Sequence, residues 1–258
     1  CVSDLELARR MNYIEKTPHF NTILKCIKDT SITKHLKHLI SVSGIPLQQV
    51  ETDFAVDASG FSTSMFGRWF DVRLGKNSEK RKFIKAHLTC GVKTNIITAI
   101  NITKGYSADS PEFKSLIDQT NRIYNIKEVS ADKAYSSRKN LQTTYDLGAI
   151  PFIPFKSNVG HGTKSNTSNI WKKMYIYFTE YQQQFYHHYH KRSNCESTFN
   201  MIKCKFGSHL RSRSEIGQEN EILVKCLCHN LCVLIQEAFE LGIDLNFEKC
   251  ADIPIAHE

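Results

Sequence analysis

The chain has 258 residues, of which 41% are hydrophobic and 23% charged, enough for one large domain or two small ones with a buried core. Its net charge is +8 and its bases gather after residue 156, which suggests a polyanionic partner, nucleic acid first; a basic protein without a special partner accounts for the charge equally well. Apolar runs end before the roughly 18 residues of a membrane span, and the start does not resemble a secretory signal, so we expect a cytoplasmic protein without a membrane partner.

Residues 1–48 are predicted to form a helical N-terminal segment. One helix is expected after Thr17 as its N-cap, with Pro18 at the first helical position, and a second between Ser31 and Gly44. The chain starts at Cys1 rather than at methionine, which is compatible with a fragment of a longer protein.

Residues 49–245 are predicted to form an α/β domain that begins with antiparallel strands. In residues 53–61 the side chains alternate with a period of two, which places Asp57 on the same face as the small residues Ala55 and Ser59. Residues 68–75 and 82–103 are rich in β-branched and aromatic residues and predict two or three further strands in antiparallel succession.

The second half of this domain alternates helices and strands. A helix is expected over residues 107–125, capped by Asp109 or Ser110 with Pro111 in its first turn. A strand that ends at Asp132, a helix closed by Gly148 and a strand near residues 149–156 follow. Residues 156–170 are predicted to be a loop, the rest a long helical region, and residues 246–258 a C-terminal tail.

Nine cysteines without framework spacing, in a chain with no recognisable secretory signal, indicate reduced thiols rather than disulfides. The cluster "CLCHNLC", residues 226–232, has the residue types of a zinc site. It lies inside an apolar helical stretch, however, and free cysteine packs as a small hydrophobic residue. Core packing is therefore the preferred interpretation.

The segment "YHKRSNCESTFNMIK", residues 189–203, contains one acid, Glu196, among many bases. At 100° per residue an ordered row of polar side chains falls within one stripe of a helix, and it comprises Tyr189, Arg192, Glu196 and Lys203. Beside it lies a core-facing seam of Cys195, Phe199, Ile202 and Phe206. An ordinary ion pair between positions i and i+4 is the simple alternative for the glutamate.

Asp57 and Asp132 occupy positions where sheet enzymes place chemistry. Asp57 lies on the first strand, and Asp132 at the carboxyl end of a later one, where open α/β sheets present ligands. Together with Glu196 they supply three carboxylates, and carboxylate oxygen is what hard divalent ions such as Mg²⁺ prefer.

The stretches "AVDASGF", "SADKAY" and "YHKRSNCESTFNMIK" resemble the DDE transposases of prokaryotic insertion sequences. The likeness extends from about Thr17 to about Glu240, and the third stretch matches a Tyr-Arg-Glu-Lys signature subgroup at every spacing. The family's fold implies an α/β, ribonuclease H-like mixed sheet, with three antiparallel strands, then βαβ units, and helices on both faces. Ala134 stands where glycine is frequent in the family, which we expect to be harmless.

What the resemblance implies is a metal-dependent recombinase. Asp57, Asp132 and Glu196 would be the catalytic triad and would bind two Mg²⁺ ions, with Mn²⁺ able to substitute. The implied DNA-binding residues, which would contact phosphates or stack, are Tyr189, Arg192 and Lys203. The implied partners are double-stranded DNA, as the element's terminal inverted repeats and the target, and a second copy in a synaptic homodimer. A ribonuclease H-like nuclease without joining activity, or an inactive DNA-binding remnant, are the rivals.

Other polar residues are assigned structural roles. Asp53 shares the face of Asp57, but the family's pattern selects Asp57. We expect Asp71 and Asp146 to be solvated and His87 to be structural. The cluster of His187, His188 and His190 is expected to lie on a solvated or DNA-facing surface. Lys133 and Tyr135 match the second motif without an assigned role.

Overall fold

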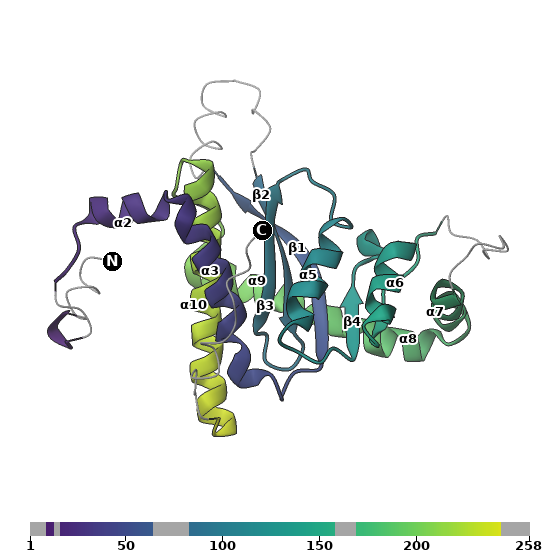
Figure 1. Ribbon diagram of the computed structural model, residues 1–258. Coiled ribbons are helices and arrows are strands. Elements are labelled where there is room, and N and C mark those ends of the chain that lie inside the picture. Colours follow the sequence, from purple (N-terminus) through teal and green to yellow (C-terminus); the bar gives the residue numbers. More distant parts are fainter. Residues whose placement is uncertain (1–8, 13–15, 64–82, 158–168, 244–258) are drawn as a thin grey trace.

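The computed structural model describes residues 9–12, 16–63, 83–157 and 169–243. At its centre is a five-stranded sheet in the order β3-β2-β1-β4-β5 (Figure 1). The strands are β1 (Asp53–Ser62), β2 (Phe83–Gly91), β3 (Ile97–Lys104), β4 (Glu128–Ala131) and β5 (Ile150–Phe152). The first three pair antiparallel, whereas β4 runs parallel to β1 and β5 parallel to β4. The predicted order of antiparallel strands followed by βαβ units is confirmed.

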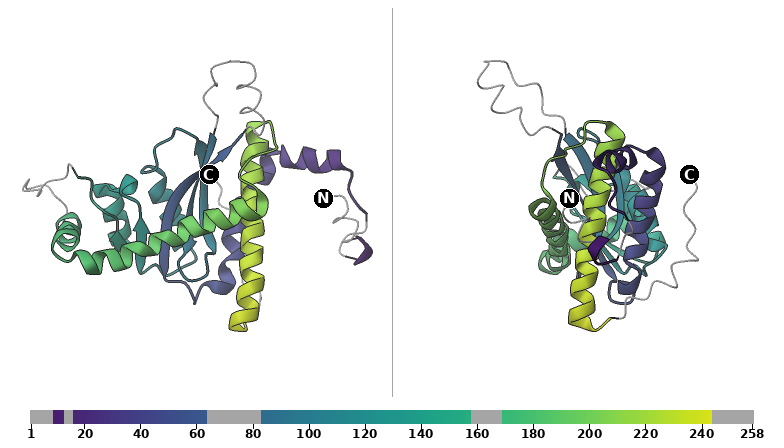
Figure 2. Two further views of the ribbon diagram at one scale, coloured as in Figure 1. Left: turned by 180° about the vertical axis from the view of Figure 1, so that it is seen from behind. Right: turned by 90° about the vertical axis from the view of Figure 1, so that its left-hand side faces the viewer.

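The alternation of side chains in β1 divides the core into two layers. Phe54 and Val56 point to one face and pack with α5 (Glu112–Asn121) and α6 (Arg138–Asp146). Ala55 and Phe61 point to the other face and pack with α9 (Ser193–Phe206) and α10 (Glu215–Leu241). Seen from behind, α8 (Gln182–Tyr189) and α9 cross this second face (Figure 2). Helices therefore cover both faces of the sheet, as expected for a ribonuclease H-like fold.

Helix α3 (Thr30–Ser43) of the N-terminal segment contributes to the same core. Helix α2 (Phe20–Ile27) precedes α3, and a 3-10 turn (Ile45–Leu47) leads into β1. In α3, Leu36 and Ile40 join the cluster of Ala55 and Leu88. The division of the chain at residue 48 stays a prediction, and the proposed tail at 246–258 lies outside the described residues, as do the expected strand at 68–75 and most of the expected loop at 156–170.

Helix α10 lies beside α3 and is anchored to it by buried amides (Figure 1). Asn230 donates to the carbonyl oxygens of Ile40 and Ile97, and Asn220 donates to that of Ile27. In length and composition this helix could cross a membrane, but 44% of its most apolar window is buried inside the protein. Many of its apolar side chains therefore pack against α3, α9 and the sheet.

The Cys-His cluster of α10 packs into the protein as predicted. Cys226 is fully buried, and His229 is 4% exposed and contacts the carbonyl oxygen of Asn95 through Nε2, 3.0 Å away. Cys228 and Cys232 are half-buried. Among the described residues no three His, Cys, Asp or Glu side chains form a group able to hold a metal ion as they stand.

Three helix starts differ from the predicted caps. The side chain of His19 caps α2, and that of Asp29 caps α3 by accepting from the amide of Ser31, so Thr17 and Ser31 are not the caps. Helix α5 starts after Pro111 without a side-chain cap, because the carboxylate of Asp109 pairs with Lys85 instead. A long-range ion partner thus outcompetes the local amide.

Candidate active site

Asp57 and Asp132 are brought together by the parallel pairing of β1 and β4. Val56 pairs with Ala131, so the two aspartates follow as the next positions of neighbouring strands, and they share a face by parity. Each carboxylate is held by a backbone amide: Asp57 accepts from the amide of Ala58 at 2.8 Å, and Asp132 from that of Lys133 at 2.6 Å. The sheet thereby fixes two acids side by side.

Glu196 lies on α9, above this face, and Arg192 connects it to β1. One guanidinium nitrogen, Nη1, lies 3.2 Å from the Asp57 carboxylate, and the other, Nη2, lies 2.7 Å from that of Glu196. The i to i+4 ion pair that the sequence offered as an alternative is therefore present. The same arginine also reaches Asp57, 135 positions away in the chain, so the pair is part of a cluster that joins strand and helix.

The electrostatics of Asp57 show that the acids act on one another. Burial raises the pKa of this carboxyl, and the charges of Glu196 and Asp132 raise it further, against the Ala58 amide and Arg192, which lower it. Like charges close together favour protonation unless a cation lies among them. In the structure that cation is the guanidinium of Arg192, whose own pKa is raised by its bond to Glu196 despite burial.

The other two residues of the predicted row flank this cluster. The guanidinium carbon of Arg192 lies 5.8 Å from the centre of the Tyr189 ring. Nζ of Lys203 donates to the hydroxyl of Ser59 at 2.6 Å and lies 5.3 Å from the centre of the Phe61 ring. Burial lowers the pKa of Lys203. Arg192, Glu196 and Lys203 therefore lie along the face of β1 that carries Asp57, whereas the ring of Tyr189 lies beside Arg192 and packs against the cluster of Phe54 and Val56.

The expectation of one continuous helix through this row is wrong. Helix α8 ends at Tyr189, a 3-10 turn spans His190–Arg192, and α9 begins at Ser193. The row persists because the turn is only three residues long and stays close to helical geometry. The predicted seam is confirmed, since Cys195, Phe199 and Ile202 are buried and Phe206 packs against them.

The remaining candidates divide between surface and structure. Asp146 is held by Gln142 on the surface, and His87 is fully buried with Nε2 2.8 Å from the hydroxyl of Thr103. His188 departs from the expected surface: its Nδ1 lies 2.9 Å from Glu128, and its ring stacks on Phe152. Asp71 lies outside the described residues.

Sequence reasoning missed a second charged group beside the site. Lys191 donates to Asp53 and to Glu128, each at 2.6 Å. The sequence does contain a sign of this group: each of the two strands has an acid four positions before its site aspartate, Asp53 before Asp57 and Glu128 before Asp132. In a strand, residues four positions apart lie on the same face. The family pattern alone favours Asp57 over Asp53.

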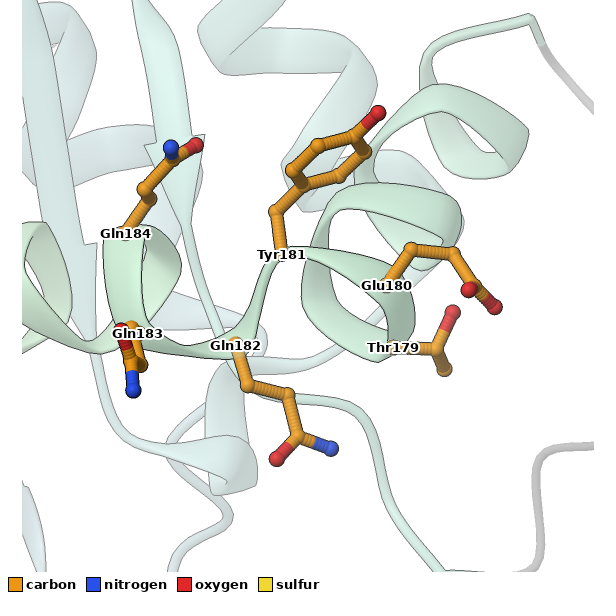
Figure 3. Close-up of a pocket in the computed structure, with 6 residues that line it drawn as sticks. All are labelled: Thr179, Glu180, Tyr181, Gln182, Gln183 and Gln184. Carbon is orange, nitrogen blue, oxygen red and sulfur yellow. The ribbon is translucent and has the colours of Figure 1, made fainter.

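The structure also has a shallow hollow at the joint between α7 (Asn169–Glu180) and α8 (Figure 3). Its lining is a consecutive run of polar side chains, with Tyr181 and Gln184 on one side of the chain and Gln182 on the other. It includes none of the three site acids, which belong to β1, the end of β4 and α9.

Comparison with known proteins agrees with this geometry. The family model described as the transposase DDE domain matches residues 48–231, a span that contains β1, β4, α9 and all three acids. No curated protein matches the chain. Because the matched span covers most of the sequence and the whole sheet, the chain belongs to the transposase DDE domain family.

Proposed function

We propose that this transposase cleaves DNA at the ends of a mobile element and joins those ends to target DNA. The observation that carries the proposal is the cluster of Asp57, Glu196 and Arg192 on one face of the sheet, with Asp132 directly after the adjacent strand. The matched family supports the same reaction class. The Tyr-Arg-Glu-Lys spacing further supports membership of the prokaryotic subgroup with that signature.

Asp57, Asp132 and Glu196 fit a pair of divalent ions by donor chemistry. Their carboxylates are hard oxygen ligands, and the raised pKa of Asp57 shows an acid whose ionised form a cation would stabilise. When bound, two Mg²⁺ ions activate the attacking oxygen and stabilise the leaving oxygen of an in-line displacement, and we expect Mn²⁺ to replace them. Arg192 bonds to both Asp57 and Glu196, so its guanidinium would compete with a divalent ion held by these two carboxylates.

Arg192 then becomes available for DNA. A guanidinium released from two carboxylates can bind a phosphate through the same planar fork. Lys203, held by Ser59 two positions beyond Asp57, supplies a second cation further along the strand. Tyr189, which packs under the guanidinium, limits where Arg192 can move and offers a hydroxyl or ring face to the nucleic acid. These three residues therefore orient the scissile phosphate over the acids.

The test is a cleavage and strand-transfer assay with DNA that carries the inverted repeats recovered from the genomic flanks of the reading frame. The chain should nick these ends in Mg²⁺ or Mn²⁺ and join them to a plasmid, and Asp57→Asn and Glu196→Gln should each reduce the rate by at least about a thousandfold. Lys114→Met, on the far side of the sheet, is the matched control.

The same assay separates the rival functions. Nicking of DNA without terminal repeats and without joining would identify a nuclease, and binding without cleavage in any metal would identify an inactive remnant. Mass photometry with two-ended DNA tests the expected homodimer. A complex with one chain per pair of ends would refute it.

A further inference from the structure

The face of β1 and β4 that carries the site has a second pair of acids at its other end. In the parallel register of β1 and β4, Asp53 pairs with Glu128. Four positions further along both strands, Asp57 and Asp132 occupy corresponding positions, directly after the pair of Val56 and Ala131. Four residues of strand span about 13 Å, so the two acid pairs are well separated. Between them lie Ala55 and Ser130, which have small side chains.

The 3-10 turn between α8 and α9 lies over this face and sends two consecutive cations in opposite directions. Arg192 reaches Asp57 in the middle of β1, whereas Lys191 reaches the outer pair, Asp53 and Glu128, at the start of β1 and β4. The small residues beneath let the backbone just before the turn approach closely: Ser130 donates from its hydroxyl to the carbonyl oxygen of His188, in the last turn of α8, at 3.3 Å. The turn is thus tied to β1 at two positions and to the start of β4 at one.

The contacts around Lys191 hold its side chain in one position. The side chains of Lys191, Asp53 and Glu128 are 24%, 20% and 17% exposed. Burial alone would lower the pKa of Lys191, yet its hydrogen bonds to the two acids raise it. His188 holds Glu128 from the other side, at 2.9 Å, while its ring stacks on Phe152 with centroids 4.4 Å apart. Partly buried charges paired in this way have defined positions.

We propose that Lys191, together with Asp53, Glu128 and His188, is a positioning device that places Arg192 and Glu196 over Asp57. Arg192 is the next residue in the chain, and Glu196 lies in the first turn of the helix that the turn starts. A shift of the turn would move both side chains relative to the strand acids, and a misplacement of about 1 Å can reduce a rate by about a hundredfold. None of the four residues touches the reacting atoms in this scheme, which rests on the proposed function for its kinetic part only.

The test compares Lys191→Met, Lys191→Arg and the control Lys114→Met, whose native lysine forms an exposed ion pair with Asp118 on α5. In Lys191→Met, kcat for end cleavage should fall about 10- to 100-fold with little change in KM. Lys191→Arg should recover most of the loss, because it keeps a cation between the two acids. Lys114→Met should behave as wild type.

A second measurement needs no activity. Hydrogen exchange of the amides in residues 189–196 should accelerate at least about tenfold in Lys191→Met, while exchange in β2 and β3 stays unchanged. Glu128→Gln, which leaves Lys191 paired with Asp53, gives a milder version if Lys191→Met folds poorly.

Three results would overturn the inference. They are unchanged exchange in both Lys191→Met and Glu128→Gln, wild-type kcat in Lys191→Met, and a loss expressed in KM that points to direct DNA contact. If the wild-type chain itself cleaves no DNA, the proposed function fails, and the exchange experiment alone decides the role of Lys191.

Discussion

Replacing Arg192 with glutamine tests whether this side chain competes with a divalent ion for the site acids. The guanidinium bonds to Asp57 and Glu196 at 3.2 and 2.7 Å, so an ion that uses both carboxylates must displace it. Glutamine keeps a polar side chain of moderate length but removes the charge. We expect Arg192→Gln to bind Mn²⁺ more tightly than the wild type in the absence of DNA, although it should cleave DNA more slowly.

The size of the effect follows from the two contacts. The bond to Glu196, whose side chain is 56% exposed, is an i to i+4 surface pair and contributes about 0.3 to 0.5 kcal/mol. The bond to Asp57 is longer but lies where both side chains are 19% exposed, and about 1 kcal/mol is reasonable for it. Releasing about 1.4 kcal/mol in total corresponds to a tenfold lower Kd for the metal.

The assay is titration of Mn²⁺ followed by electron paramagnetic resonance, with isothermal calorimetry for Mg²⁺. Lys114→Met serves as the charge-matched control, and Asp57→Asn marks the affinity that remains when a site acid is lost. A Kd in Arg192→Gln equal to or higher than that of the wild type would contradict the competition, because the guanidinium would then lie outside the space that the metal uses.

Three further predictions concern other parts of the molecule. Burial raises the pKa of Asp57 above its ordinary value of 3.8, so the ionised carboxylate at pH 7 destabilises the folded chain relative to the unfolded one. Asp57→Asn should therefore raise the free energy of unfolding at pH 7. Urea titrations should show this gain shrinking as the pH falls through the raised pKa and vanishing below 3.8, where the carboxyl is protonated in both states. Lys203→Met should reduce the slope of log K against log salt for DNA by about one, measured by fluorescence anisotropy, and an unchanged slope would remove Lys203 from the interface. Glu51→Gln should cost about 1 to 3 kcal/mol, seen as a lower Tm. Oε1 of the fully buried Glu51 accepts from the Lys93 amide and from the amide and hydroxyl of Thr94, and Oε2 accepts from the Lys93 amide at 3.3 Å. In glutamine one of these two oxygens becomes an NH2 group, which cannot accept, and the remaining amide oxygen is a weaker acceptor than a carboxylate oxygen. A Tm within about 1 °C of wild type would refute that account.

The local sequence pattern was sufficient to predict most of the secondary structure and which faces of β1 and α9 are buried. The period of two in residues 53–61 assigned Asp57 and Ser59 to one face, and the helical seam of Cys195, Phe199 and Ile202 assigned α9 to the core. Both follow from backbone geometry, because side chains return to the same face every two residues in a strand and every 3.6 residues in a helix. The pattern of apolar residues within a short segment therefore indicates which face is buried. The order of elements and the row from Tyr189 to Lys203 depend on the same geometry.

Which charges meet was decided by the tertiary structure. Asp53 and Asp57 lie on the same face of the same strand. The neighbouring sequence does not indicate that Lys191 pairs with Asp53 and Arg192 with Asp57. Lys191 lies 138 positions from Asp53 and 63 from Glu128 along the chain, and those two acids meet only through the register of β1 against β4. Register and ion pairing depend on packing across the whole sheet, so a window of neighbouring residues contains no information about them.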